Sequence, residues 1–165
     1  PPDDVPRPVE RTIASIAEQV EAIDAIVDRA RSRLRVFDVD LSQGGWHTAD
    51  RAERLVAFLR RAHGPRVDVI VHDTRWLAQS CPRLITVLRL YGHAITVYRT
   101  GSEARNAMDP LVIGDDRHFL HRFHVDGPRA ALAFDSPIAA RPLVARFEEI
   151  WATGEPGLSG TVLGL

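Results

Sequence analysis

Polar residues with catalytic or ligand-binding side chains follow a run of β-branched residues near the middle of the chain. Residues 67–71 are typical of a strand buried on both faces of a parallel sheet, and His72, Asp73, Thr74 and Arg75 come directly after them. In open α/β sheets, ligands bind just beyond the carboxyl ends of such strands. The sequence therefore predicts a site at this turn.

Further charged residues are predicted at the same edge of the sheet. Arg99 ends the next strand along the chain, and Asp38 and Asp40 lie near the end of the preceding one. The planar fork of donors on arginine suits phosphate, sulfate or a carboxylate. Two interpretations remain open. In the first, a small anionic ligand is held by Arg75 and Arg99, with His72 beside them. In the second, an ion-pair network of Asp40, Arg75 and Arg99 braces the sheet.

Three histidines are spaced three residues apart, at His118, His121 and His124. On a strand, the first and third share one face and His121 points to the other, so the three do not converge on a metal. We expect no metal and no cofactor. His121 is a candidate ligand residue, with a hydrogen-bonded structural histidine as the alternative. Cys81 lacks a motif that would mark a nucleophile, and no Gly-x-Ser-x-Gly elbow is present.

The composition excludes several classes of protein. All 21 basic residues of the 165 are arginine, so a Walker-type phosphate loop, a Schiff-base enzyme and any other site built on an ammonium group are ruled out. One cysteine allows no internal disulfide, and we expect a cytoplasmic protein. No run approaches the ~20 apolar residues of a membrane helix, and no signal peptide opens the chain, so no membrane partner is expected.

The charge balance gives no reason to expect nucleic acid as a partner, because the formal net charge is −1. Arg60, Arg61 and Arg66 form a local basic patch with His63. This patch lacks aromatic residues interleaved with the arginines, so nucleic-acid binding is the less favoured interpretation.

Alternating apolar patterns predict one α/β domain at residues 9–165, preceded by a proline-rich linker or tail at residues 1–8. We predict a mixed, mainly parallel sheet with helices on both faces. Ser15 and Thr48 are expected to cap two of the helices. The last residues, 154–165, should pack back on the body. The predicted helices are residues 15–32, 48–63, 82–91 and 137–151, and the predicted strands are 9–14, 34–41, 67–71, 94–98, 111–113, 119–125 and 130–134.

The order of these elements resembles one half of the phospholipase D superfamily, over about residues 9–152. The stretches that carry the resemblance are residues 30–36, 67–71, 91–99 and 146–151, the last with a Phe-x-x-x-Trp pattern. Within the superfamily, the chain looks most like an uncharacterised bacterial phospholipase D-like domain that is sometimes appended to acetyltransferase domains. Active members bring two such half-units together about a two-fold axis, which implies a homodimer or an attached neighbouring domain.

The catalytic motif of the active family is His-x-Lys, with an aspartate five residues after the lysine. If Asp115 is that aspartate, Met108 and Pro110 occupy the histidine and lysine positions. In the register of Asp116 these positions hold Asp109 and Leu111. The resemblance therefore carries over the fold and Asp115, but not the nucleophile.

These observations favour a non-catalytic phospholipase D-like binding or interaction module, or an accessory domain of a larger bacterial protein. The alternative is a diverged phosphoesterase that uses His72 or His121. No catalytic residue is assigned. The candidate ligand-binding residues are His72, Arg75, Arg99, Asp40, Asp115 and His121.

Overall fold

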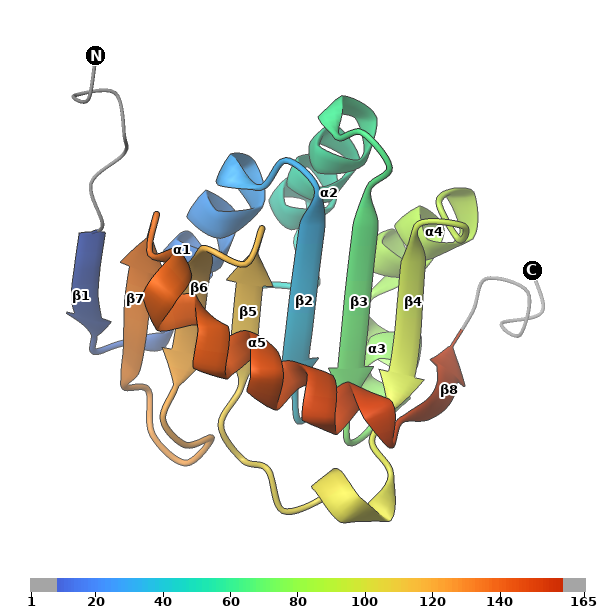
Figure 1. Ribbon diagram of the computed structural model, residues 1–165. Coiled ribbons are helices and arrows are strands. Elements are labelled where there is room, and N and C mark those ends of the chain that lie inside the picture. Colours follow the sequence, from blue (N-terminus) through green and yellow to red (C-terminus); the bar gives the residue numbers. More distant parts are fainter. Residues whose placement is uncertain (1–8, 159–165) are drawn as a thin grey trace.

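The computed structural model describes residues 9–158, and the predicted linker at residues 1–8 lies outside them. Eight strands form a single sheet in the order β1-β7-β6-β5-β2-β3-β4-β8 (Figure 1). The strands are β1 (Val9–Ile13), β2 (Arg33–Asp38), β3 (Arg66–Val71), β4 (Ile95–Arg99), β5 (Leu111–Gly114), β6 (His118–Arg122), β7 (Ala130–Phe134) and β8 (Glu155–Leu158).

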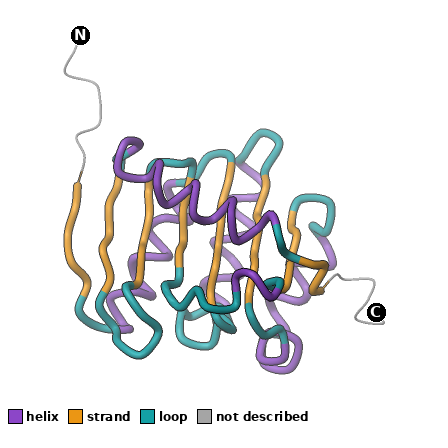
Figure 2. The backbone as a smooth tube through the Cα atoms, turned by 60° about the horizontal axis from the view of Figure 1, so that its bottom comes forward, coloured by secondary structure: helices purple, strands orange, loops and turns teal. Residues whose placement is uncertain are grey.

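Helices cover both faces of the sheet, as predicted (Figure 2). One face carries α1 (Ile16–Arg29), α2 (Ala49–Arg61), α3 (Arg75–Ser80) and α4 (Pro82–Leu90), and α5 (Pro137–Ala152) crosses the other obliquely (Figure 1). A 3-10 turn, η2 (Ser102–Ala104), follows β4. Within residues 9–158, no helix is both long and apolar enough to cross a membrane.

Local sequence signals explain where the first two long helices begin. The Ser15 side chain accepts a hydrogen bond from the amide of Glu18 at 3.2 Å, which confirms the predicted cap of α1. Thr48 accepts in the same way from the amide of Arg51 at 3.1 Å at the start of α2. Each cap satisfies a backbone donor that the first turn of a helix leaves free.

The prediction of a mainly parallel sheet is wrong, although the mixed α/β class is confirmed. Only β2–β3 and β3–β4 pair in parallel among the described strands, and β5, β6 and β7 form an antiparallel meander beside them. At the two edges, β1 pairs with β7 and β8 pairs with β4, both antiparallel. The pairing of β8 agrees with the predicted return of residues 154–158 to the body, and residues 159–165 lie outside the described part.

Two apolar cores lie on either side of the sheet. The larger, between the sheet and α1–α4, includes Ile26, Val36, Phe58, Val69 and Leu88. The smaller lies beneath α5 and is built from Phe37, Ile70, Leu111, Ile113, Phe119, Ala133, Ala140, Phe147 and Ile150. Because α5 rests on Phe37 and Leu111, it is held over the carboxyl end of β2.

The middle strand of the three parallel ones, β3, is buried on both faces, but it is not apolar throughout. Asp68 is only 1% exposed and faces the side of α5. Arg33 and Arg66 neutralise it, with nitrogen–oxygen distances of 2.8 and 2.9 Å. Buried carboxylates need such partners, since an isolated charge is costly in a protein interior.

The predicted strand at residues 34–41 ends earlier than expected, at Asp38. Leu41 adopts a left-handed backbone with a φ of 71°, which is incompatible with a continuing strand. Asp40 accordingly lies in the loop, where its carboxylate accepts bonds from the amide and hydroxyl of Ser42 at 2.9 and 2.7 Å. The prediction that Asp38 and Asp40 share one side of a strand is therefore wrong.

Candidate functional site

The carboxyl ends of the parallel strands meet the segment that leads into β5, at the lower edge of the sheet in Figure 1. Because β5 is antiparallel to β2 and pairs Leu111 with Phe37, residues 108–110 lie beside the end of β2. The α5 helix passes over the same edge. Three stretches far apart in sequence thus come together where the sequence predicted a site.

His72 lies at this edge with both ring nitrogens in use. Its Nδ1 is 2.6 Å from the hydroxyl of Thr100, and its Nε2 is 2.6 Å from the carbonyl oxygen of Ala107. A carbonyl can only accept, so Nε2 donates to Ala107, and in the neutral ring Nδ1 accepts from Thr100. The ring also meets Phe37 edge-on at 5.4 Å. His72 therefore ties the loop around Ala107 to the end of β3.

Asp109 connects the start of β5 to α5 and β6. Its Oδ2 is 2.8 Å from Nε2 of His121 and accepts a bond of 2.7 Å from Nε of Arg146, whose Nη2 donates to Oδ1. Burial opposes ionisation of Asp109, but the bonds from Arg146 and His121 outweigh it and lower the pKa of the carboxyl. Asp109 and Arg146 thus form a charged pair, with His121 oriented against the carboxylate.

Two open hollows adjoin this cluster, with cavity volumes of about 420 and 330 Å³. Both are lined by Asn106 and Arg146, and we call the two together the Arg146 groove. The larger is lined by Glu103, Ala104, Asn106, Ala107, Arg146, Glu149, Ile150 and Thr153. The smaller is lined by Asn106, Met108, Asp109, His121, Phe123, His124 and Arg146.

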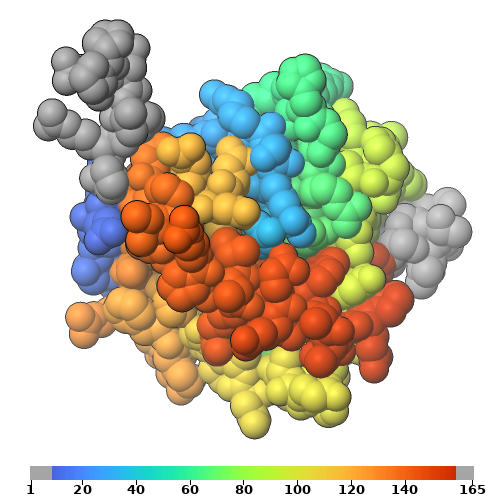
Figure 3. Space-filling view, viewed as in Figure 1, coloured from blue at the N-terminus to red at the C-terminus, as the bar shows by residue number. Residues whose placement is uncertain are grey.

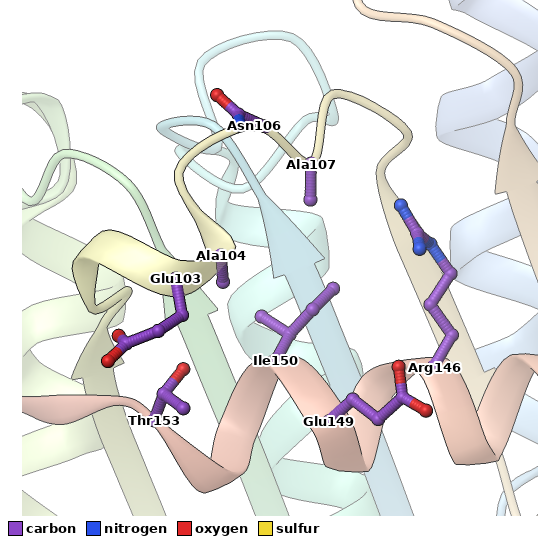
Figure 4. Close-up of a pocket in the computed structure, with 8 residues that line it drawn as sticks. All are labelled: Glu103, Ala104, Asn106, Ala107, Arg146, Glu149, Ile150 and Thr153. Atoms are coloured by element: carbon purple, nitrogen blue, oxygen red, sulfur yellow. The ribbon is translucent and has the colours of Figure 1, made fainter.

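The groove runs between α5 and the segment at residues 103–110. Figure 4 shows Arg146, Glu149 and Ile150 on α5 facing the backbone of residues 103–107. In the space-filling view, the yellow surface of this segment lies directly below the red surface of α5 (Figure 3). The groove is therefore open to solvent along one side of α5.

The other residues predicted for this edge form separate contacts. Arg75 has a side chain 82% exposed and pairs with Asp73 at 2.6 Å, whereas Arg99 pairs with Glu155 at 3.3 Å. The bonds of Asp40 go to Ser42, as described above. Within residues 9–158, no hydrogen bond or ion pair links Asp40, Arg75 and Arg99, so the structure does not form the predicted bracing network.

Asp115 lies at the opposite end of β5 from Met108. Its φ of 53° is left-handed, and its carboxylate accepts bonds from the amides of Arg31, Ser32 and Arg33 at 2.7, 2.9 and 3.0 Å. This carboxylate therefore holds the connection between α1 and β2. Of the six candidate ligand residues, His121 lines the Arg146 groove and His72 supports its wall.

His118 and His121 lie on opposite faces of the sheet, as predicted, but His124 does not lie on the strand. His118 is buried on the side of α1, where its Nδ1 accepts a bond of 3.0 Å from the amide of Asp135, and His121 faces α5. β6 ends at Arg122, so His124 lies in the following turn rather than on the strand. Among the described residues, no group of three acidic, histidine or cysteine side chains is arranged to hold a metal.

Sequence reasoning missed Arg146, Asn106 and the role of Asp109 in this groove. Arg146 was visible only as part of the closing helix, 37 residues from Asp109. The register of β5 and β6 contains a usable signal, since Leu111 pairs with His121. Asp109 stands two residues before Leu111 on the same side of the chain, which brings it within reach of His121.

Comparison with protein-family models gives a match over residues 15–159 to a family described as Domain of unknown function (DUF7931). Comparison with curated protein sequences finds no significant match.

Several solved structures share the fold at low sequence identity. Nuc from Salmonella typhimurium, a phospholipase D family member, is 15% identical with a TM-score of 0.65, covering 93% of this chain and all of Nuc. NucT from Helicobacter pylori is 14% identical with a TM-score of 0.63, covering 92% of this chain and all of NucT. The archaeal chromatin protein TrmBL2 is 10% identical with a TM-score of 0.66, covering 90% of this chain and 54% of TrmBL2. The chain thus belongs to the DUF7931 family, and its fold is phospholipase D-like.

Proposed function

We propose that this domain is a non-catalytic phospholipase D-like binding module whose ligand site is the Arg146 groove. The observation that carries the proposal is which residues occupy the positions of the catalytic His-x-Lys motif. Met108 and Pro110 stand where the resemblance places the nucleophilic histidine and the lysine. Neither side chain can attack a phosphodiester or transfer a proton.

The nearby polar groups support the same conclusion. Both nitrogens of His72 are in hydrogen bonds within the fold, and the Asp109 carboxylate is bound to Arg146. A nucleophile needs a free lone pair at the position of the reacting atom. Binding requires only complementary charge and shape, which the groove retains.

The charges in the groove favour an anionic group in the smaller hollow. Arg146 lines both hollows, but Glu103 and Glu149 also line the larger one and repel anions. The smaller hollow is lined by a single carboxylate, Asp109, which is already paired with Arg146, and by two imidazoles. Within residues 9–158, no hydrogen bond uses Nη1 of Arg146. Met108 and Phe123, which are 36% and 49% exposed, supply apolar surface beside this charge. The ligand we propose is a small molecule with a carboxylate or phosphate and an apolar part.

We predict that the domain shows no phosphodiesterase activity. Turnover of a chromogenic phosphodiester by the wild-type protein should equal that of the His72→Ala, His121→Ala double variant, because the motif positions hold no nucleophile. A phosphodiesterase of known activity, assayed in parallel, is the positive control for the substrate. Activity that exceeds the double variant would contradict the prediction.

A second candidate function is a diverged phosphoesterase that uses His121. The observation in its favour is the 2.8 Å contact between His121 and Asp109, since a carboxylate that orients an imidazole is a common arrangement for a general base. The same assay separates the two functions. Activity lost in His121→Ala but retained in His72→Ala would support the diverged enzyme.

We also predict that phosphate stabilises the wild-type fold through Arg146. At constant ionic strength, added phosphate should raise the melting temperature, because a ligand that binds only the folded state stabilises it by mass action. Arg146→Gln should abolish the phosphate-dependent rise, whatever its effect on the basal melting temperature.

The matched control for this experiment is Arg75→Gln, which removes an arginine that is also paired with an aspartate but lies outside the groove. The control should keep the full phosphate-dependent rise. Loss of the rise in Arg75→Gln alone would instead place the anion at the turn after β3, and no rise in the wild type would contradict anion binding at either position.

A further inference from the structure

The opposite end of the sheet from the Arg146 groove carries a concentration of arginines. α1, α2 and α4 all end there, at the amino ends of β2, β3 and β4 (Figure 1). The strand register aligns Arg33 with Arg66, and Val67 with Ile95, so the residues before these strands lie along one edge. We call the basic residues of these segments the arginine patch: Arg31, Arg60, Arg61, His63, Arg66, Arg89 and His93.

Hydrogen bonds between the helix ends hold Arg61 beside the end of α1. The guanidinium of Arg61, from α2, donates to the carbonyl oxygens of Val27, Asp28 and Ala30 at the end of α1, with distances of 2.5, 3.0 and 2.9 Å from Nη2. Burial and the nearby positive charge of Arg31 both lower the pKa of Arg61.

Arg60 extends the patch to the end of α4. Its Nε is 3.4 Å from the hydroxyl of Tyr91, the residue that follows this helix. Tyr91 therefore supplies an aromatic ring among the arginines, which the sequence pattern alone did not place there.

The positive charge of the patch exceeds what the fold itself needs. Arginines at the ends of helices balance the partial negative charge there, roughly half a unit for each helix. The carboxylates nearest the patch are already committed, since Asp28 pairs with Arg54, Asp115 binds three backbone amides, and buried Asp68 is shared by Arg33 and Arg66. Arg31, Arg60 and Arg89 are exposed and form no ion pair within residues 9–158.

We propose that the arginine patch binds the phosphate backbone of nucleic acid, a second site distinct from the Arg146 groove. Guanidinium groups donate in a planar fork that matches phosphate oxygens, and the hydroxyl of Tyr91, whose ring packs against the core, contacts Arg60 in the patch. The net charge of −1 does not oppose this, because charges more than about 10 Å away are largely screened at physiological salt. One exposed apolar side chain, Leu90 at 66%, gives little surface for insertion into a bilayer.

The experiment measures binding of a short fluorescent DNA duplex by anisotropy between about 50 and 200 mM NaCl. We expect salt-dependent binding by the wild type. The variant Arg31→Gln, Arg60→Gln, Arg89→Gln should lose about tenfold or more in affinity at the lower salt concentration. The slope of log affinity against log salt should fall by about 2 to 3, because each lost phosphate contact contributes about 0.9.

The matched control is Arg11→Gln, Arg129→Gln, Arg141→Gln, which removes the same charge from exposed positions elsewhere. The control should bind within about twofold of the wild type, and Arg→Lys changes at the three patch positions should retain most of the binding. Absence of binding in the wild type, an equal loss in both glutamine triples, or tighter binding to anionic phospholipid vesicles than to the duplex would each overturn the proposal.

Discussion

Asp115→Ala is expected to lower the free energy of unfolding by about 2–4 kcal/mol, one of the two largest effects that we predict. Asp115 accepts hydrogen bonds from the amides of Arg31, Ser32 and Arg33 and from the hydroxyl of Ser32. Hydrogen bonds to a charged group contribute more than neutral ones, and their loss leaves three backbone donors without this partner. Alanine also tolerates the left-handed φ of 53° poorly.

Asp115→Asn is the matched control. Asparagine keeps one acceptor oxygen and accepts left-handed backbone, so this variant should lose about half as much stability as alanine. Urea unfolding followed by circular dichroism at neutral pH measures the free energy of unfolding of both variants. Wild-type stability in Asp115→Ala would contradict the prediction.

The stability lost in Asp115→Ala should depend on pH, and the pKa of Asp115 gives the direction. Burial alone would raise the pKa of Asp115, but the bonds from the three backbone amides outweigh burial and lower it. A carboxyl with a lowered pKa in the folded state contributes stability above its ordinary value of 3.8 and loses it as the pH falls through the folded value. The difference in the free energy of unfolding between wild type and Asp115→Ala should therefore become smaller at acidic pH.

The sequence predicts local structure well because the signals are local. The caps at Ser15 and Thr48 and the parallel strands around residues 67–71 depend on residues a few positions apart. The direction of the flanking strands depends instead on how three short segments after residue 110 pair with β2 and with one another. Asp126 and Gly127 are typical of a hairpin turn, and the strands on either side of them, β6 and β7, pair antiparallel. The pairing of β5 with β2 has no such local signal.

The candidate site was only partly predictable for a related reason. His72 follows a strand, so its approximate place could be inferred, but its hydrogen-bond partners could not. The partner of His72 is a backbone carbonyl 35 residues away, which leaves no trace in side-chain types. Arg146 joins the groove because α5 crosses the sheet obliquely, and the angle of a helix is set by packing rather than by its own sequence pattern.

Asp38→Asn is expected to stabilise the fold at neutral pH, the other large effect that we predict. Asp38 ends β2 and lines a small hollow with Gln19, Gln43 and Arg122. Burial, joined by the charge of Asp40, raises its pKa from 3.8 to about 6, although a bond from the amide of Val39 and the charge of Arg122 act in the opposite direction.

The sign of the effect follows from linkage between protonation and folding. A folded pKa above the unfolded value means that the contribution of Asp38 to stability is greatest below pH 3.8 and is lost as the pH rises through about 6. The shift corresponds to about 3 kcal/mol at most, and because solvent partly reaches Asp38 we expect Asp38→Asn to gain about 1–2 kcal/mol above pH 7. Below pH 4 the two proteins should be equally stable. Asparagine keeps an oxygen for the bond from Val39.

Urea unfolding of both proteins across this pH range tests the prediction, and Asp40→Asn provides the control. The control removes the same charge two residues along, where the carboxylate bonds Ser42 in the loop, and it should bring no gain at neutral pH. A loss of stability in Asp38→Asn above pH 7 would show that the charged carboxylate holds the strand end together. A gain would show that this carboxylate opposes folding at neutral pH.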